Sequence, residues 1–402
     1  MNAESTGGLR RAAPDGIVAC VLLAFMATAG LFYVNIMPAL VAGLIDGLGF
    51  SNREAGFVGS ANVYGAACGA LIAVFLVRRL PWRRTQVVLL LLLLSLDLVS
   101  TFVTTAGPLT ALRFLHGVVG GTSVGIGLAV MARTAIPDRA FGMLLTVQYG
   151  AGGLGIMFLP ALAKSYGPEV LFLALAAFTL VTLAMLPFLA EYPPRARPSA
   201  AAEARGRAQR GPLIRTLVAV FLFQAANMGL SAFIIPLGRH YGLEDAFISG
   251  TIGVANWIGA LGSIAVIWMA GRFGRTAPVA CVLLVSVAGT AAFLLSGTAA
   301  VFIMANVATA VAWSFLIPYF FGMCADFDPA GQSATLAGFF SKMGLATGPA
   351  AAALLLGQDN YALLINVSVT SLIVCGLAVI TPARSLDAGR VQGLRSGAGV
   401  ST

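Results

Sequence analysis

Twelve stretches of apolar residues, separated by short polar segments, run along this sequence. A helix of about 20 apolar residues crosses a hydrocarbon layer about 30 Å thick, so each stretch predicts a membrane-spanning helix. Most connections between the stretches are only about three to ten residues long, which predicts antiparallel neighbours in a helical bundle. The predicted spans are residues 17–44, 55–77, 85–105, 109–131, 141–163, 170–190, 216–236, 247–270, 277–296, 300–324, 332–356 and 361–382.

The second and the eighth predicted spans share one pattern of small residues. Segment 55–66 aligns with segment 249–260, and the alignment, continued without a gap, brings Arg78 onto Arg272. The coincident pairs are Gly56 and Gly250, Gly59 and Gly253, Ala61 and Ala255, Asn62 and Asn256, Gly65 and Gly259, and Ala66 and Ala260. Glycine and alanine at helical spacing are typical of contacts between membrane helices. The repeat therefore predicts an all-α integral membrane fold of twelve transmembrane helices in two pseudo-symmetric six-helix halves.

A segment without an apolar face separates the two halves. Residues 191–215 are rich in proline, alanine and arginine, which is typical of a flexible linker. The expected organisation is an N-terminal half over 1–190, this cytoplasmic linker, a C-terminal half over 216–382 and a disordered cytoplasmic tail over 383–402. A basic segment beside a membrane either binds anionic membrane lipids or only fixes orientation, and the linker fits both interpretations.

Composition and charge place the chain in a bilayer. Of its 402 residues, 59% are hydrophobic and 10% are charged, whereas about 25% of residues are charged in soluble proteins. With the N-terminus inside, 19 of the 24 Lys and Arg residues fall in cytoplasmic segments, and only Arg53, Lys164 and Arg239 fall outside. This positive-inside bias predicts a multi-pass protein of the inner (plasma) membrane with both termini cytoplasmic, and it explains the net charge of +9 without nucleic acid. The first apolar stretch is longer than the core of a signal peptide, about 7–15 residues, so we expect it to remain as a helix.

The five cysteines lie inside predicted helices at unrelated spacings. This pattern fits neither a disulfide framework nor a metal motif, and packing accounts for it. We expect no cofactor and no metal, and a monomer in the membrane.

Two short arginine-rich loops follow the second and eighth predicted spans. Residues 271–276 read GRFGRT, and residues 78–84 read RRLPWRR. The first is similar to the loop pattern Asp-Arg-x-Gly-Arg-Arg of the major facilitator superfamily of secondary transporters, with Gly271 in place of the acid and Thr276 in place of the last arginine. The second keeps only the final arginine pair. With the two six-helix halves and the long basic central loop, these motifs make the whole chain except its tails resemble that family.

The resemblance implies roles for several arginines. Arg83, Arg84, Arg272 and Arg275 would form a cytoplasmic gate by binding helix C-termini, and simple anchoring is the alternative. In the fourth span, residues 113–121 read RFLHGVVGG, which is similar to the family pattern Arg-x-x-x-Gly-x-x-Gly, whose buried arginine is linked to proton coupling. The family's antiporter signature, a Gly-Pro pair followed by Gly-Gly in the fifth span, is absent from the sequence, so the resemblance implies no direction of transport.

Three charged residues, Asp97, Arg113 and Lys342, fall within apolar spans, where a charge costs at least about 2.5–3.5 kcal/mol. Counting levels from the turn between the third and fourth spans places Asp97 within one residue of His116 and about one helical turn from Arg113. An acid paired with either cation can load and release a proton, which predicts proton coupling through Asp97, Arg113 and His116. The alternative is a static buried ion pair.

Lys342 lies near the middle of the eleventh span and is one of only two lysines among the 24 Lys and Arg residues. Unlike arginine, a desolvated lysine can lose its proton and regain it on meeting an anion. This predicts a substrate site. The alternative, a lysine that reaches the membrane surface, requires a climb of about 12–15 Å.

Uncharged polar and aromatic residues supply the rest of a predicted cavity lining. Besides Lys342 and Arg113, the predicted substrate contacts are Tyr33, Asn35, Gln148, Tyr149, Gln224, Asn227, Trp313 and Tyr319. In the family that the chain resembles, spans 1, 4, 7 and 10 line the path. Each of these side chains can equally well bond another helix. The symmetric pair Asn62 and Asn256 predicts a shared structural role.

These features predict a secondary active transporter that works by alternating access around a site near the midplane. Two cations, Arg113 and Lys342, against one acid, Asp97, favour a small organic anion moved together with protons. The alternative is a proton-driven exporter of amphipathic or drug-like compounds, which the aromatic and methionine residues favour. An enzyme would need clustered histidines or acids, and the two histidines, His116 and His240, lie far apart. The sequence has no filter-like loop of a channel and no nucleotide-binding loop.

Overall fold

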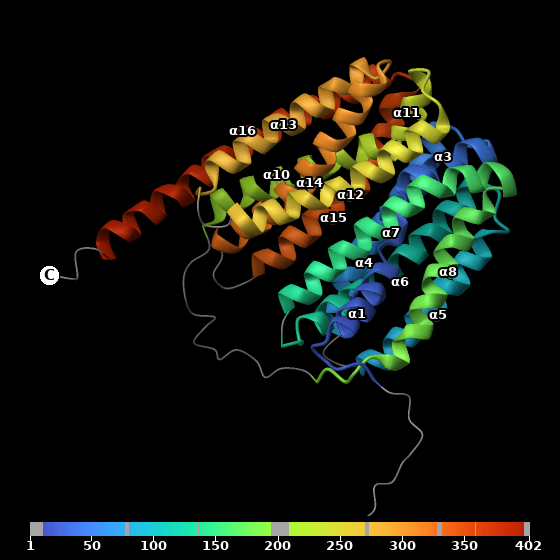
Figure 1. Ribbon diagram of the computed structural model, residues 1–402, viewed down its shortest axis with the longest axis horizontal. Helices are drawn as coiled ribbons and strands as arrows, with labels where there is room; N and C mark the ends of the chain where they lie inside the picture. The colour runs from blue at the N-terminus through green and yellow to red at the C-terminus, as the bar shows by residue number, and fades with distance from the viewer. Residues whose placement is uncertain are drawn as a thin grey trace, which may run out of the picture.

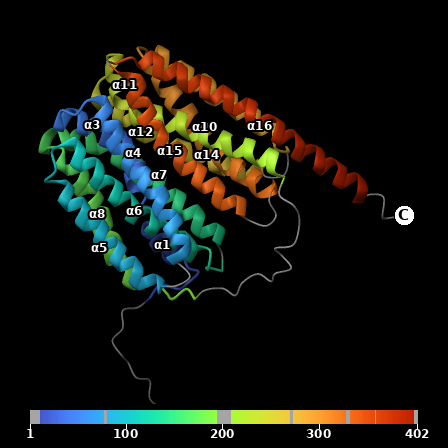
Figure 2. The same ribbon diagram turned by 180° about the vertical axis from the view of Figure 1, so that it is seen from behind.

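The computed structural model describes residues 11–76, 80–135, 137–193, 209–269, 273–327, 332–357 and 359–397. Within these ranges the chain forms helices and no strand. Figures 1 and 2 show two helical bundles side by side, the first containing α1–α8 and the second α10–α16. In both bundles one end lies at α3 or α11, and the other lies at the end of α8 or the start of α10 (Figure 1). We call these the α3/α11 end and the linker end.

The described chain makes twelve passes, if the broken first pass of each half is counted once. The first half contains α1 (Ile17–Ala29), α2 (Phe32–Asn35), α3 (Met37–Leu48), α4 (Asn52–Leu76), α5 (Trp82–Ser100), α6 (Ala106–Met131), α7 (Pro137–Tyr166), α8 (Glu169–Met185) and the 3-10 helix η1 (Leu186–Phe188). The second half contains α10 (Arg210–Ala232), α11 (Ile234–His240), α12 (Asp245–Met269), α13 (Thr276–Ala292), the 3-10 helix η2 (Phe293–Leu295), α14 (Ala299–Phe327), α15 (Gln332–Leu356) and α16 (Tyr361–Gly397). The predicted fold of two six-helix halves is confirmed.

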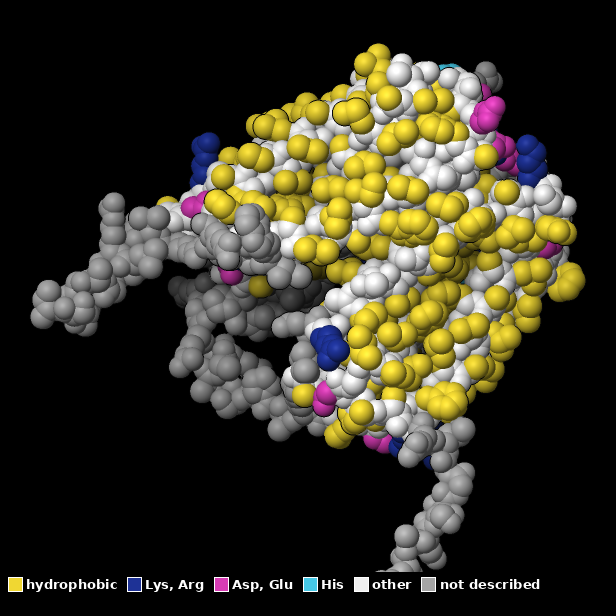
Figure 3. Space-filling model, viewed as in Figure 1, with side chains coloured by type: hydrophobic (Ala, Val, Ile, Leu, Met, Phe, Trp, Pro, Cys, Tyr) yellow, Lys and Arg dark blue, Asp and Glu magenta, His cyan; other side chains and the backbone are white. Residues whose placement is uncertain are grey.

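Length and surface agree with a multi-pass membrane protein. Ten helices of the described chain are long and apolar enough to cross a membrane, and α1 and α3 are shorter apolar helices. Figure 3 shows hydrophobic side chains over the flank of both bundles and charged side chains toward their ends. Backbone groups within a bilayer must be satisfied internally, which a bundle of helices achieves.

The first pass of each half bends at a proline. α2 and α3 meet at Ile36, just before Pro38, and α10 and α11 meet at Phe233, just before Pro236. Both junction residues have φ −108° and ψ 16°. Proline has no N–H to bond to the carbonyl four residues earlier and its ring displaces that carbonyl, so the helix bends. The two halves therefore share the break as well as the order of their spans.

Glycines bring α4 and α6 into backbone contact. A Cβ atom built on Gly117 would lie 1.9 Å from the carbonyl oxygen of Asn62, and one on Gly65 would lie 2.1 Å from that of Phe114. Only glycine fits so close an approach between two helices. The contact holds α6, with its buried charged residues, firmly against α4.

The two halves meet mainly where α4 packs on α15 and α7 packs on α12. α7 and α12 cross at Gly153 and Gly253: a Cβ atom on the first would lie 3.0 Å from the carbonyl oxygen of the second, and the reverse distance would be 2.9 Å. A Cβ atom on Gly56 of α4 would likewise meet Pro349 and Ala353 of α15. Both contacts between the halves therefore depend on small residues.

The structure corrects two predicted boundaries. α10 begins at Arg210, inside the segment 191–215 that was expected to be the linker. α16 continues to Gly397, so most of the tail 383–402 is helical, although the sequence predicts disorder. A search for apolar stretches detects where contact with lipid ends, whereas a helix continues as long as its backbone hydrogen bonds do.

The extension of α16 is tied to the second half by Asp387. Its carboxylate accepts hydrogen bonds from the backbone N–H groups of Arg275 at 2.7 Å and Thr276 at 2.9 Å. These N–H groups stand at the start of α13, where a helix has no internal acceptors for them. Asp387 therefore caps a helix other than its own.

Candidate functional site

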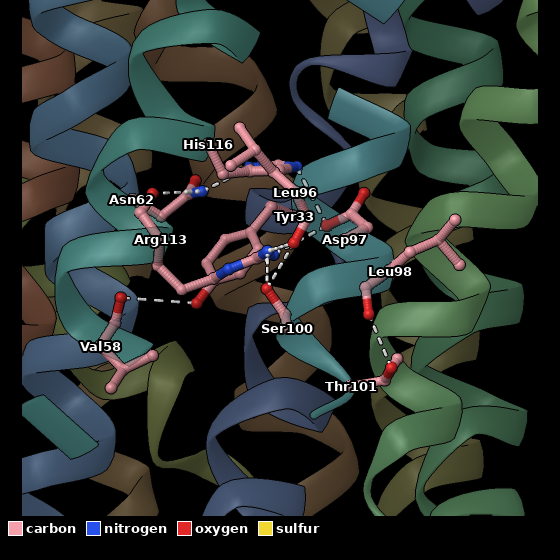
Figure 4. A network of polar contacts seen from close by, with 10 residues as sticks. All are labelled: Tyr33, Val58, Asn62, Leu96, Asp97, Leu98, Ser100, Thr101, Arg113 and His116. Atoms are coloured by element: carbon pink, nitrogen blue, oxygen red, sulfur yellow. Dashed lines mark hydrogen bonds and ion pairs between the residues drawn. The ribbon is translucent and has the colours of Figure 1, made fainter. Parts of the chain in front are cut away.

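A buried charged cluster lies where α5 faces α6 in the first half (Figure 4). The Arg113 Nη1 donates to Asp97 Oδ1 at 2.8 Å, and His116 Nε2 lies 3.2 Å from the same oxygen. Arg113 Nη2 also donates to the Leu96 carbonyl oxygen at 3.0 Å and to the Ser100 hydroxyl. The predicted proximity of Asp97 to both Arg113 and His116 is confirmed, because one carboxylate oxygen contacts both.

Asn62 determines which nitrogen of His116 carries the proton. The Asn62 Nδ2 donates to the Arg113 carbonyl oxygen at 3.2 Å and lies 2.8 Å from His116 Nδ1. An amide nitrogen only donates, so Nδ1 accepts and the proton of the neutral ring is on Nε2, where it is donated to Asp97. The cluster thus balances one carboxylate against one guanidinium and keeps the imidazole uncharged.

Aromatic rings surround the guanidinium. The Arg113 Cζ lies 5.1 Å from the ring centre of Phe172 and 5.9 Å from that of Tyr33. Asp97 and Arg113 are both fully buried. Among the described residues, nothing hydrogen-bonds the second carboxylate oxygen of Asp97. Since a buried acceptor without a partner is costly, this oxygen is the open position for a proton.

A separate cavity of about 240 Å³ lies between the two halves. Its polar lining comprises Asn35, Gln148, Tyr149, Gln224, Ser231, Asn256, Ser263, Trp313 and Ser314. Five of the predicted substrate contacts are among these residues, and none of the lining residues is charged. A site of this kind binds polar groups through amides, hydroxyls and an indole.

Gln224 holds one wall of this central cavity in place. Its Oε1 accepts a hydrogen bond from Trp313 Nε1 at 2.6 Å, and its Nε2 donates to Ser341 Oγ at 2.7 Å. Both ends of the amide are therefore engaged, and the indole of Trp313 is fixed against α10. Asn227, one turn further along α10, lines a smaller adjacent cavity.

Lys342 follows Ser341 on α15. Helical spacing places it on the same face as Pro349, which lies against Gly56 of α4, so Lys342 is directed toward the first half. Its side chain is half-buried. Among the described residues Lys342 has neither a hydrogen bond nor an ion pair. Within this part of the chain it is a cation without a partner inside a membrane helix.

Five predicted substrate contacts are not among the residues that line the central cavity: Lys342, Asn227, Arg113, Tyr33 and Tyr319. Arg113 belongs to the charged cluster, and Tyr33 packs beside it with its hydroxyl 3.5 Å from the Val58 carbonyl oxygen. Tyr319 stacks on Phe315 in the core of the second half. Sequence spacing gives the depth of a residue in a span but not the face of the helix it occupies when the helix is apolar all round.

Two of the four arginines expected to form a gate, Arg83 and Arg275, make contacts within their own half. Arg83 donates to carbonyl oxygens of η1 and of the residues after it, including that of Ala190 at 3.1 Å, and lies 3.0 Å from Glu191. Arg275 binds Asp326 at 2.8 Å within the second half. Arg84 is exposed. Arg272 lies outside the described residues.

A charged cluster at the α3/α11 end, which the sequence does not reveal, joins the halves. Arg239 of α11 binds Asp46 of α3 across the interface and Asp245 of α12 at 2.6 Å, and Asp245 lies 3.5 Å from Lys164 of α7. Burial alone would lower the pKa of the Arg239 guanidinium, but its hydrogen bonds to the two carboxylates raise it above its usual value. In the described chain, the ion pairs between the halves are confined to this end.

The symmetric asparagines have different surroundings. Asn62 bonds within the charged cluster, whereas Asn256 lines both cavities. A shared structural role for the two stays a prediction. The repeat reflects common helix packing, since the neighbouring glycines serve close contacts in both halves.

Comparison with known proteins agrees with this architecture. The profile of the Major Facilitator Superfamily matches residues 19–353. Similar solved structures are those of the nucleoside transporter NupG (TM-score 0.68, 12% identity, 92% of this chain and 98% of that chain) and of a D-xylose-proton symporter (TM-score 0.68, 13% identity, 91% and 96%). A third is that of a bacterial homologue of the human lysosomal transporter Spinster, inward-facing and unoccupied (TM-score 0.66, 15% identity, 91% and 95%). No curated protein matches the sequence.

Proposed function

The chain belongs to the major facilitator superfamily, and from this premise we propose that it is a proton-coupled secondary transporter that moves a small organic anion by alternating access. The transported compound binds between the halves, in the central cavity lined by Asn35, Gln148, Tyr149, Gln224 and Trp313. Lys342 of α15 does not itself line this cavity, and in the proposal it supplies the positive charge beside it.

Lys342 carries the anion assignment. A charge within the apolar part of a membrane costs at least about 2.5–3.5 kcal/mol. Arg113 is compensated by Asp97 at 2.8 Å, whereas Lys342 has no partner among the described residues. A carboxylate that binds the lysine ammonium forms a charge-assisted hydrogen bond and offsets this cost. An anion is therefore preferred over a neutral or cationic compound.

We assign proton coupling to Asp97, Arg113 and His116. A proton on the free oxygen of Asp97 leaves Arg113 without its counter-charge. Protonation then favours a conformation in which the guanidinium reaches water or another anion, which converts proton binding into a conformational preference. Because the cluster lies outside the central cavity, this coupling runs through movement of α5 and α6 and not through contact with the substrate.

The position of the ion pairs supports a conformation closed at the α3/α11 end. We propose that the halves, 1–190 and 216–382, rock as two bodies joined by the segment 191–215. The positive-inside distribution assigns the linker end to the cytoplasm. The central cavity is then closed toward the outside in this conformation.

A second candidate function is proton-driven export of amphipathic compounds. The apolar part of the central cavity lining favours it, since Leu145, Ile156, Met228, Ile252 and Ile317 stand beside the polar groups. Such a surface binds compounds with a large apolar portion. The unpaired Lys342 argues for the anion.

Proteoliposomes with a pH-sensitive dye inside test the proposal. The purified protein would be challenged with lactate, succinate, gluconate and benzoate, and with the cationic dye ethidium. Lys342→Ala removes the proposed charge, and Arg53→Ala is the control, since it removes an exposed cation that lies outside the proposed sites. Size-exclusion chromatography verifies that each variant is folded.

We expect at least one anion to move protons with the parent and with Arg53→Ala. The same anion should move protons at least about tenfold more slowly with Lys342→Ala, because one charge-assisted contact is lost. Proton movement driven by ethidium alone, unaffected by Lys342→Ala, would refute the anion assignment in favour of export.

A further inference from the structure

A second cavity, of about 70 Å³, lies inside the second half between α10, α12 and α14. It adjoins the central cavity, because Met228, Ser231, Ile252, Asn256 and Trp313 line both. The indole of Trp313 stands between them and is held there by Gln224. We call the smaller space the rear cavity.

Asparagines from three helices line the rear cavity: Asn227 of α10, Asn256 of α12 and Asn306 of α14. The Nδ2 atoms of Asn227 and Asn306 each donate, at 2.8 Å, to the carbonyl oxygen four residues earlier in their own helix. Each amide nitrogen uses one of its two N–H groups in this way, so the second N–H and the side-chain oxygen of each residue remain for a ligand. No hydrogen bond reaches either oxygen within the described chain.

Thr309 adds an acceptor. Its hydroxyl donates to backbone carbonyl oxygens of α14, so its lone pairs remain for a ligand. Asn306 is only 7% exposed. The rear cavity thus presents hydrogen-bond acceptors together with amide donors to any group that enters it.

The rear cavity lining contains no carboxylate. An ammonium group would enter without a counter-charge, which burial penalises heavily. A hydroxyl group both donates and accepts hydrogen bonds and carries no charge. Hydroxyl groups therefore fit the rear cavity better than ammonium groups or purely apolar groups.

We propose that the rear cavity binds the hydroxyl-bearing end of the substrate, so that the transported anion is a hydroxylated carboxylate. This inference rests on the proposed function, in which Lys342 binds the carboxylate. Gln224 connects the two positions, because it bonds both Trp313 at the boundary of the rear cavity and Ser341, the residue before Lys342. One extended molecule then engages α15 at its charged end and the rear cavity at its hydroxylated end.

Binding measurements on the detergent-solubilised protein test this with three six-carbon probes. Gluconate carries a carboxylate and hydroxyls, hexanoate carries only the carboxylate, and sorbitol carries only hydroxyls. Glycerate and propionate form a three-carbon pair of the same design. The variants are Asn306→Leu and Asn227→Leu, with Asn366→Leu, an exposed asparagine of α16, as the matched control. Lys342→Gln tests the charged end.

For the parent protein we expect gluconate to bind at least about tenfold more tightly than hexanoate, or glycerate to bind at least about tenfold more tightly than propionate. The deoxy acids lack the hydroxyl groups and so lose those hydrogen bonds. Asn306→Leu and Asn227→Leu should each abolish most of this ratio and leave the deoxy probe within about twofold of its parental affinity, and Asn366→Leu should preserve it. Lys342→Gln should weaken both carboxylates and leave sorbitol unchanged.

Failure of the two assignments gives different results. Equal binding of the hydroxylated and deoxy acids, unchanged in Asn306→Leu and Asn227→Leu but lost in Lys342→Gln, would overturn the rear-cavity inference and retain the anion transporter. Equal binding of sorbitol and gluconate, unaffected by Lys342→Gln, would overturn the anion assignment and the hydroxylated carboxylate with it. Binding of none of the hydroxylated probes would overturn the substrate class.

Discussion

Removing either member of the Asp97–Arg113 pair leaves the other buried without its counter-charge. The stability of the two variants should therefore depend differently on pH. In Asp97→Leu the guanidinium loses its 2.8 Å contact with the carboxylate and stays fully buried. Breaking a buried ion pair from one side costs about 3–5 kcal/mol of stability. Arginine keeps its charge at all accessible pH values, so this loss should be the same from about pH 5 to about pH 8.

In Arg113→Met the stranded group is a carboxyl, which can take up a proton. A buried unpaired acid binds a proton in the folded state that the unfolded state has already released, so folding gains stability as the pH falls. The gain is about 1.4 kcal/mol per pH unit. Arg113→Met should lose about 3–5 kcal/mol at high pH and recover about 2.7 kcal/mol when the pH is lowered by about two units.

The double variant Asp97→Leu/Arg113→Met separates charge from packing. Replacing a buried ion pair by apolar residues of similar volume is often neutral, so the double variant should be more stable than either single variant. If it also continues to couple proton movement to transport, the pair is only structural and the proposed coupling role fails.

Thermal unfolding in detergent measures these effects through the reaction of a thiol-specific dye with Cys20, Cys324 and Cys375, which are buried in the folded protein. Parallel pH profiles for the two single variants would refute the reasoning, as would a double variant that is less stable than both.

Three further changes probe the packing and the interface. Gly117→Val should prevent folding, because its Cβ atom would lie 1.9 Å from the Asn62 carbonyl oxygen. The control Gly107→Val has no atom within 4 Å of the added Cβ and should give a normal size-exclusion profile. Asp46→Asn breaks the partly exposed ion pair with Arg239 between the halves, which is worth about 0.2–1 kcal/mol. It should increase labelling of a cysteine introduced nearby in α3. Unchanged labelling would show that the pair does not hold this end closed. Asp387→Ala removes the cap of α13 and should lower the stability of the protein by about 1 kcal/mol. We expect faster amide hydrogen exchange in the first turn of α13, and unchanged exchange would contradict the capping role.

The sequence predicts the number and order of the passes, because a lipid-facing helix needs a long apolar stretch whatever its neighbours are. The same criterion misses what depends on backbone chemistry. The bends before Pro38 and Pro236 lie inside apolar stretches, and the helix that continues to Gly397 lies beyond one. Hydropathy does not distinguish a straight helix from a bent one.

The charged cluster could be located from the sequence, because Asp97 and Arg113 lie on two helices of one hairpin and their depths follow from helical rise. Contacts between the halves do not follow in this way. Asp46 and Arg239 are 193 residues apart, and Gln224 meets Trp313 only because α10 packs beside α14. Such pairs depend on how the helices are rotated and which of them are neighbours.

α7 and α12 touch at Gly153 and Gly253, so each helix can rotate about this contact as a lever does about its fulcrum. In α12, Gly253 lies 8 residues from the start of the helix and 16 from its end. In α7, Gly153 lies 16 residues from the start of the helix and 13 from its end. At 1.5 Å per residue the arms toward the linker end are about 24 Å in both helices, but only about 12 Å and 20 Å toward the α3/α11 end. A rotation of about 10° at the fulcrum therefore moves a linker-end tip by about 4 Å and the near tip of α12 by about 2 Å. In the rocking movement proposed above, the longer arms would open the linker end wider than the α3/α11 end, so a bulky solute would pass the linker end with more clearance.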